Sequence, residues 1–123
     1  MSGCRLVLPW PPSVNRLWRH VMIGKSVRTI VSKEGRDYKT AVKSYCLAQK
    51  APVGIDYKVA VLIKLQPPDG RRRDIDNSCK ALLDSLTASG VWVDDSLIDD
   101  LHVYRADVVP GGKATVEIWR VDA

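Results

Sequence analysis

The stretch from Arg71 to Lys80 combines residue types that act on phosphates and on metal ions. It reads Arg-Arg-Arg-Asp-Ile-Asp-Asn-Ser-Cys-Lys. Carboxylates this close repel one another, and a hard cation such as Mg²⁺ binds one or two carboxylates while leaving positions for water and phosphate oxygens. Arginine side chains beside such a site have an obvious partner in a phosphate backbone. The pattern therefore indicates metal-dependent phosphodiester chemistry on a nucleic acid.

The two aspartates of this stretch have both a chemical and a structural interpretation. If the backbone is extended at Asp74, then Asp74 and Asp76 point to the same side, because side chains at i and i+2 share a face. Lys80 follows Asp76 by one helical turn, where it can act on phosphate charge. Alternatively, Asp76 caps a helix, and Lys80 forms i, i+4 pairs with Asp76 and with Asp84, each contributing only about 0.2–0.5 kcal/mol. That alternative leaves the three arginines and Asp74 unexplained.

A second acidic pair, Asp94-Asp95, follows about twenty residues later. One of the two completes a three-carboxylate metal site with Asp74 and Asp76, and the residues alone do not say which. The structural alternative is a polar turn, because turns commonly recruit aspartate. Taken together with the upstream pair, the metal site is the better interpretation.

Other polar and aromatic residues have weaker signals. Asn77 can bond a phosphate, support a carboxylate or begin a helix. His20 has no partner histidine at ligand spacing, so a phosphate contact suits it better than a metal. Trp10 and Trp18 can stack on bases, although tryptophan beside a proline-rich loop more often serves packing.

Charge is distributed unevenly along the chain. The net charge is +5 over 123 residues, and residues 1–50 carry 10 Lys/Arg against 2 Asp/Glu, a net of +8. A basic half beside an acidic half suits a nuclease that holds phosphate with one and metal with the other. A mildly basic solvated surface is the alternative.

The length predicts a single domain, residues 1–123. The three cysteines, Cys4, Cys46 and Cys79, are odd in number and far apart, which argues against a disulfide framework and for a reducing, cytoplasmic location. The first residues have no signal-peptide pattern. No apolar run approaches the roughly 18 residues of a membrane span, so we expect no membrane partner.

The elements that must position these residues form an α+β domain of order β-β-α-β-α-β-β, with a mixed sheet and two helices. Period-two patterns predict strands, period-3.6 patterns predict helices, and Pro-rich or Gly-rich segments predict breaks. Strands are expected near 6–8, 27–31, 57–65, 101–104 and 114–119, and helices near 33–49 and 76–88. The segment after Pro9 is expected to be a loop to about Ile23. Ser32 is expected to cap the first helix.

The chain resembles the RusA family of Holliday-junction resolvases over nearly its whole length. The resemblance rests on an ordered set of motifs: Leu8-Pro9-Trp10-Pro11-Pro12-Ser13-x-Asn15-Arg16 with Trp18-Arg19-His20, then Arg71-Arg72-Arg73-Asp74-x-Asp76-Asn77-x-x-Lys80-Ala81 with Asp84-x-Leu86, then Gly90-Val91-Trp92-x-Asp94-Asp95, and a late Gly111-Gly112-Lys113. An Asp-x-Asp motif alone would be weak, but the ordered set is specific.

The resemblance implies a homodimeric, Mg²⁺-dependent endonuclease, with Mn²⁺ as an alternative ion, that makes paired nicks in four-way DNA junctions during recombination and repair. Its metal-binding aspartates fall on Asp74, Asp76 and Asp95, and its functional lysine falls on Lys80. These four are the expected catalytic residues. DNA contacts are expected from Arg71, Arg72, Arg73, Asn77, Asn15, Arg16 and Arg19.

Two other functions fit parts of the same pattern. One is a metal-dependent nuclease for flaps, single strands or RNA, which a comparison of substrates separates from a junction enzyme. The other is a DNA-binding or architectural module whose acidic pairs only cap helices. Binding without cleavage in any divalent ion would favour that second alternative.

Overall fold

The computed structural model describes residues 3–12, 18–23, 26–31 and 33–121, with 18–23 and 26–31 described by their backbone alone. The elements, in chain order, are β1 (Gly3–Pro9), β2 (Trp18–Ile23), β3 (Ser26–Val31), α2 (Lys33–Ala48), β4 (Val59–Gln66), the 3₁₀ helix η1 (Ile75–Ser78), α3 (Cys79–Ala88), the 3₁₀ helix η2 (Asp95–Leu97), β5 (Ile98–Arg105) and β6 (Lys113–Arg120).

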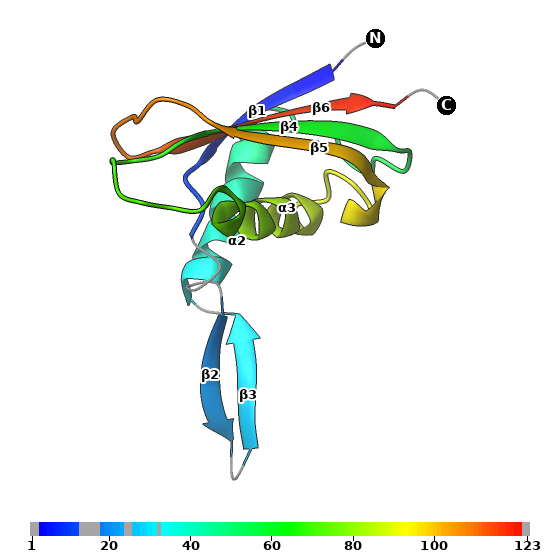
Figure 1. Cartoon of the computed structure of the whole chain (residues 1–123). Coiled ribbons are helices and arrows are strands. Elements are labelled where there is room, and N and C mark those ends of the chain that lie inside the picture. The colour runs from blue at the N-terminus through cyan, green and yellow to red at the C-terminus, as the bar shows by residue number, and fades with distance from the viewer. Residues whose placement is uncertain (1–2, 13–17, 24–25, 32, 122–123) are drawn as a thin grey trace.

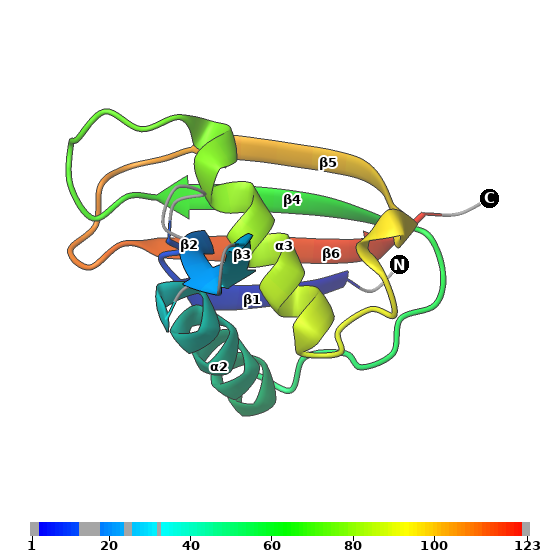
Figure 2. The same ribbon diagram turned by 90° about the horizontal axis from the view of Figure 1, so that it is seen from below.

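The main sheet has four strands in the order β1-β6-β4-β5. β6 lies antiparallel to both β1 and β4, whereas β4 and β5 run parallel. Helices α2 and α3 both cover the same face of this sheet, and the two chain ends lie together at one end of it (Figure 1). Seen from the helical side, α3 crosses the sheet diagonally and α2 lies beside β1 (Figure 2). The predicted α+β class, mixed sheet and pair of helices are confirmed.

The core lies between the sheet and the two helices. Alternate residues of the strands point into it, as the period-two patterns predict. The sheet contributes Leu6, Leu8, Val59, Val61, Ile63, Leu65, Ala114, Val116 and Ile118, and the helices contribute Tyr38, Val42, Cys46, Ala81, Leu82 and Leu86. Trp92 is fully buried, and its indole N–H donates to Thr87 Oγ1 at 2.6 Å. This packing fixes α3, and with it η1, against the sheet.

Two large apolar residues whose spacing would fit the apolar stripes of the helices lie outside the core. Tyr45 on α2 and Ile75 at the start of η1 are both exposed. Tyr45 lies beyond the arc of Tyr38, Val42 and Cys46 that faces the sheet. Ile75 precedes α3 by a 3₁₀ turn, whose three residues per turn shift it off the α-helical stripe.

The segment 18–23, expected to be a loop, forms strand β2. It pairs antiparallel with β3 from Trp18↔Val31 to Ile23↔Ser26. The resulting hairpin projects from the body beyond α2 (Figure 1). The prolines end β1 as expected, but they do not prevent a new strand six residues later. The expected cap Ser32 lies outside the described residues.

Neither α2 nor α3 combines the length and hydrophobicity needed to cross a membrane, and this holds for all of the described residues.

Candidate active site

Arg73 is held within its own loop. Its guanidinium pairs with the Asp69 carboxylate at 2.8 Å and donates to the main-chain oxygens of Asp69 and Arg71 at 3.1 and 3.3 Å. It also lies 5.7 Å from the ring centre of Trp10, within cation–π range. Only 25% of its side chain is exposed. Arg73 therefore shapes the segment leading to Asp74, and its predicted phosphate contact stays untested.

Gly112 explains how Trp10 reaches this loop. Its φ is +68°, and a Cβ there would approach Trp10 Cβ and Pro68 Cδ to 2.9 Å. Any other residue would both strain the backbone and push these side chains apart. The chain turns at Pro110 and Gly111, and Gly112 packs closely against Trp10 and Pro68 beside the loop that carries the arginines. Trp10 is half-buried against the core, which agrees with the packing role considered above.

Arg71 and Arg72 remain available to a ligand. Both residues are exposed. Arg71 makes a longer 3.7 Å ion pair with Asp69, while 83% of its side chain is exposed. The Arg71 main-chain N–H donates to the Asp69 carboxylate at 3.0 Å. That bond, followed by the Arg73 contact, lowers the pKa of Asp69.

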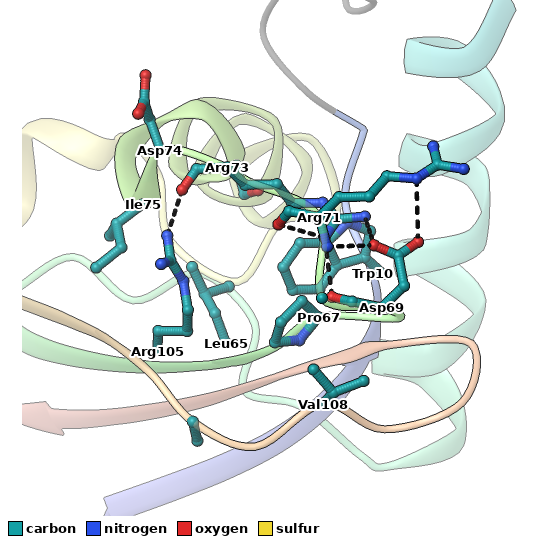
Figure 3. A pocket seen from close by; sticks show the side chains of 13 residues that line it. Trp10, Leu65, Pro67, Asp69, Arg71, Arg73, Asp74, Ile75, Arg105 and Val108 are labelled. Carbon is teal, nitrogen blue, oxygen red and sulfur yellow. Dashed lines mark hydrogen bonds and ion pairs between the residues drawn. The ribbon is translucent and has the colours of Figure 1, made fainter.

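A small cavity lies behind the loop. Its volume is about 140 Å³, and Trp10, Leu65, Arg73 and Arg105 are among the residues that line it. Figure 3 shows the Arg105 side chain reaching across from β5 to donate to the main-chain oxygen of Arg73. The Asp74 carboxylate points away from this cavity, on the outer side of the loop (Figure 3). The cavity therefore lies behind the acidic segment, and the Asp74 carboxylate itself faces solvent.

The backbone changes conformation between the two predicted metal ligands. Asp74 is extended, with φ −82° and ψ 137°, and the 3₁₀ helix η1 begins at the next residue. The i, i+2 alternation that would place Asp74 and Asp76 on one face therefore ends at Asp74. Both residues are exposed. Asp74 caps η1 by position without a side-chain hydrogen bond, so its oxygens are not used by the helix end.

Lys80 lies in the first turn of α3 and pairs with Asp84 at 3.3 Å, with 55% of its side chain exposed. One of the two i, i+4 pairs considered above, Lys80 with Asp84, is therefore present, and it leaves the Lys80 ammonium accessible. Asn77 sits in η1, where its main-chain N–H donates to the Asp74 main-chain oxygen at 3.3 Å. This bond ties Asn77 to the first predicted ligand.

The acidic pair Asp94-Asp95 lies at the start of η2. The Asp94 carboxylate accepts a hydrogen bond from Ser96 Oγ at 2.7 Å, and this bond lowers the Asp94 pKa. Asp94 stands at the N-cap position of η2 but makes no capping hydrogen bond with its side chain, whose carboxylate is engaged by the Ser96 hydroxyl. Asp95 is exposed.

Asp95 lies far from the first acidic pair in the fold. η2 leads directly into Ile98, the first residue of β5, whereas Arg105, the last residue of β5, bonds to Arg73 beside Asp74. A strand of this length spans about 23 Å. Both views show η2 at the opposite end of β5 from the start of α3 (Figures 1 and 2). Accordingly, the described residues of one chain contain no group of three or more His, Cys, Asp or Glu side chains that could hold a metal.

Three predicted DNA contacts have no described side chain. Asn15 and Arg16 lie outside the described residues, and Arg19 is described only as a backbone position in β2, opposite Ile30. Their roles stay predictions.

Two residues that shape the site were missed by the sequence analysis. Asp69 follows two prolines and precedes a glycine, a pattern that predicts only a break after the strand, although its spacing to Arg73 fits an i, i+4 ion pair. Arg105 has no local signal, because its bond to Arg73 joins residues 32 positions apart.

Known proteins resemble this chain along nearly its full length. The profile of the family described as "Endodeoxyribonuclease RusA" matches residues 9–119. A "Crossover junction endodeoxyribonuclease" from Enterobacteria phage 82 is 37% identical over 118 residues, which cover 96% of this chain and 95% of that protein. Proteins of the same name from Escherichia coli strain K12 and Shigella sonnei strain Ss046 are 38% and 37% identical over the same shares. The chain therefore belongs to the RusA family of endodeoxyribonucleases.

Proposed function

We propose that this protein is a Mg²⁺-dependent endonuclease that resolves four-way DNA junctions by paired, symmetric nicks, in recombination and repair. The observation that carries this proposal is the identity of 37–38%, across 96% of the chain, with proteins named crossover junction endodeoxyribonucleases. The three free thiols agree with a cytoplasmic setting. Mn²⁺ is an alternative ion, because it also binds carboxylate oxygens.

The exposed residues of the site divide into two chemical roles. Asp74, Asp76 and Asp95 would hold the metal, which supplies a water of lowered pKa and offsets charge on the reacting phosphate. Lys80 would stabilise negative charge on the phosphate or the leaving oxygen. Arg71 and Arg72, both exposed beside Asp74, would bind flanking phosphates and set the position of the strand.

The fold of one chain does not gather the three aspartates, and this supports a homodimer. Since Asp74 and Asp95 lie at opposite ends of β5, one chain cannot supply both to a single ion. We infer that Asp74 and Asp76 of one protomer act with an Asp95 from its partner. A two-fold dimer then contains two equivalent sites, and two cuts related by symmetry are what junction resolution needs.

The first experiment tests the reaction and its substrate. Wild-type protein is incubated with a mobile four-way junction, a fork, a flap, a duplex and single strands of the same sequence, with Mg²⁺, Mn²⁺ or a chelator. We expect paired nicks in the junction, no nicks with chelator and little cleavage of the other substrates. Asp76→Asn should bind the junction without nicking it, whereas Asp56→Asn, an exposed control, should nick normally. Equal cleavage of duplex or single strands would overturn the junction assignment.

A second experiment tests the shared site by complementation. Asp76→Asn and Asp95→Asn, each expected to be inactive, are mixed under conditions that exchange protomers. A mixed dimer then contains one site with both substitutions and one site with neither, so nicking of one strand should return. If all three aspartates acted within one chain, no mixture would have an intact site and no activity would return.

A further inference from the structure

A small apolar pocket lies where the ends of α2 and α3 meet. Its volume is about 110 Å³, and Cys46, Ala51 and Val91 line it with apolar surface that belongs to the core or packs against it. Figure 2 shows the end of α3 beside the segment that follows α2. α3 is 10 residues long, about 15 Å, and Lys80 lies in its first turn. The pocket is therefore at the other end of this helix from the predicted catalytic lysine.

The rim of this pocket carries the two most exposed large apolar residues of the described chain. Leu47, near the end of α2, is 73% exposed, and Val53, in the segment after that helix, is 81% exposed. Single exposed apolar residues are ordinary on a protein surface. Here two of them border one pocket with an apolar floor, which is the form of a site that receives an apolar side chain.

The walls of the pocket are fixed by main-chain hydrogen bonds. Next to Val53, the Gly54 N–H donates to the Gly90 C=O at 2.7 Å, which ties this segment to the chain after α3. The end of α2 is closed by the Ala51 N–H, which donates to the Cys46 C=O at 2.9 Å. Because both walls are formed before a ligand arrives, the entropic cost of binding is reduced.

The charges around the pocket are positive. Lys43 and Lys50 line it and are exposed, whereas no Asp or Glu among the described residues lines it. Lys50 is also the only non-glycine residue of the described chain with a positive φ, at +55°. Glycine would adopt this conformation at the end of a helix without that cost. The position therefore carries a cation at some expense in backbone energy, and the two lysines suit a ligand with carboxylates.

We propose that this pocket binds an acidic peptide segment of a partner protein, with one apolar side chain of the peptide in the pocket and its carboxylates beside Lys43 and Lys50. Lys43 and Leu47 are spaced i, i+4, so a cation and an apolar contact lie side by side on α2. A nucleic acid suits the site less well, because it has no aliphatic side chain to fill the pocket and its phosphates would cover Leu47 and Val53. A peptide bound here leaves Lys80 open to DNA.

The test is fluorescence anisotropy with a labelled synthetic peptide, a short run of aspartates followed by leucine. Control ligands have asparagine in place of aspartate, serine in place of leucine, or are a labelled single-stranded oligonucleotide. We expect the acidic peptide to bind the wild type more tightly than any control ligand, and less tightly as salt is added.

Two substitutions test the apolar and the charged contact separately. Leu47→Ser should weaken peptide binding roughly tenfold, because it removes a buried apolar contact. Lys50→Gly should weaken it roughly two- to fivefold, the effect of one exposed ion pair. Val108→Ser, at a residue 51% exposed after β5, and Lys33→Ala, at the start of α2, are the matched controls and should bind normally.

Lys50→Gly also separates binding from folding, because glycine relieves the positive φ and should leave the melting temperature unchanged or higher. Junction nicking should be unchanged in both variants, so a protein that binds the peptide but nicks nothing would contradict only the proposed function. Three results would overturn the inference: no binding of the acidic peptide, equal binding of the asparagine or serine peptide, or binding that neither substitution weakens. Tighter binding of the oligonucleotide, lost in the same two variants, would assign this surface to DNA and overturn it as well.

Discussion

Arg105 donates a hydrogen bond to the main-chain oxygen of Arg73, the residue directly before Asp74. The bond joins the end of β5 to the loop that carries the predicted metal ligand. On the other side, the Arg73 side chain is fixed by Asp69 and Trp10. Arg73 is therefore held through both its side chain and its carbonyl, while the carboxylate of the next residue, Asp74, stays exposed.

We expect Arg105→Ala to slow junction nicking by roughly 10- to 100-fold, because small displacements of a reacting group carry costs of that order. Arg105→Lys retains a donor and should recover part of the rate. The measurement is single-turnover nicking as a function of Mg²⁺ concentration, with particle mass measured in parallel. Arg120→Ala is the control, since Arg120 lies over Tyr57 at the far end of β6. If Arg105→Lys and Arg105→Ala nick as fast as wild type, the bond does not position Asp74.

The three adjacent arginines should behave differently from one another. Arg72→Ala should flatten the dependence of junction binding on salt, because the log–log slope on duplex DNA falls by about 0.9 for each phosphate that the protein no longer neutralises. Its effect on thermal unfolding should be small. Arg73→Ala removes an ion pair and a cation–π interaction, so it should lower the free energy of unfolding by about 1–2 kcal/mol. Salt titrations and thermal melts of both variants check this. Equal salt slopes with Arg72→Ala and wild type would remove Arg72 from the DNA interface.

Alanine substitutions of Lys80 and of Asp84 separate the structural role of their ion pair from a chemical role of the lysine. Each alanine substitution breaks the same ion pair, which on an exposed helix is worth about 0.3–0.5 kcal/mol. Only Lys80→Ala removes the cation. We expect both variants to have similar melting temperatures, and Lys80→Ala alone to lose on the order of 10²-fold in single-turnover nicking. If Asp84→Ala loses as much activity as Lys80→Ala, the ion pair and not the free ammonium is what matters.

The sequence predicted those parts of the fold that depend on local patterns. Tyr38, Val42 and Cys46 recur at helical spacing, and all three are buried on α2. The alternation of Val59, Val61 and Ile63 likewise placed β4 correctly. Strand β2 was missed because its sequence has no clear alternating pattern with one buried face. The strand is defined instead by its pairing with β3 in the hairpin.

The site was less predictable than the fold, for a geometric reason. Spacing grouped Asp74 and Asp76 with one residue of the Asp94-Asp95 pair, and the resemblance to the RusA family indicated Asp95. Spacing does not reveal the 3₁₀ turn that begins after Asp74 or the length of β5 that lies between the two acidic segments. Arg73 shows the same limit. The run of arginines suggested a phosphate contact for Arg73, which stays a prediction, but it gave no sign that Asp69 and Trp10 engage the Arg73 side chain.

Gln49 provides the last test, because it protects the edge of the sheet opposite β5. Its amide makes two hydrogen bonds to Val7, so Gln49→Ala should lower the free energy of unfolding by about 1–2 kcal/mol, at roughly 1 kcal/mol for each bond. It should also expose the β1 edge and promote association of the protein at high concentration. Lys43→Ala is a control at an exposed position of α2, the helix that ends just before Gln49. Chemical denaturation gives the stability, and light scattering gives the particle mass. Wild-type stability and particle mass for Gln49→Ala would show that the β1 edge does not depend on the Gln49 amide.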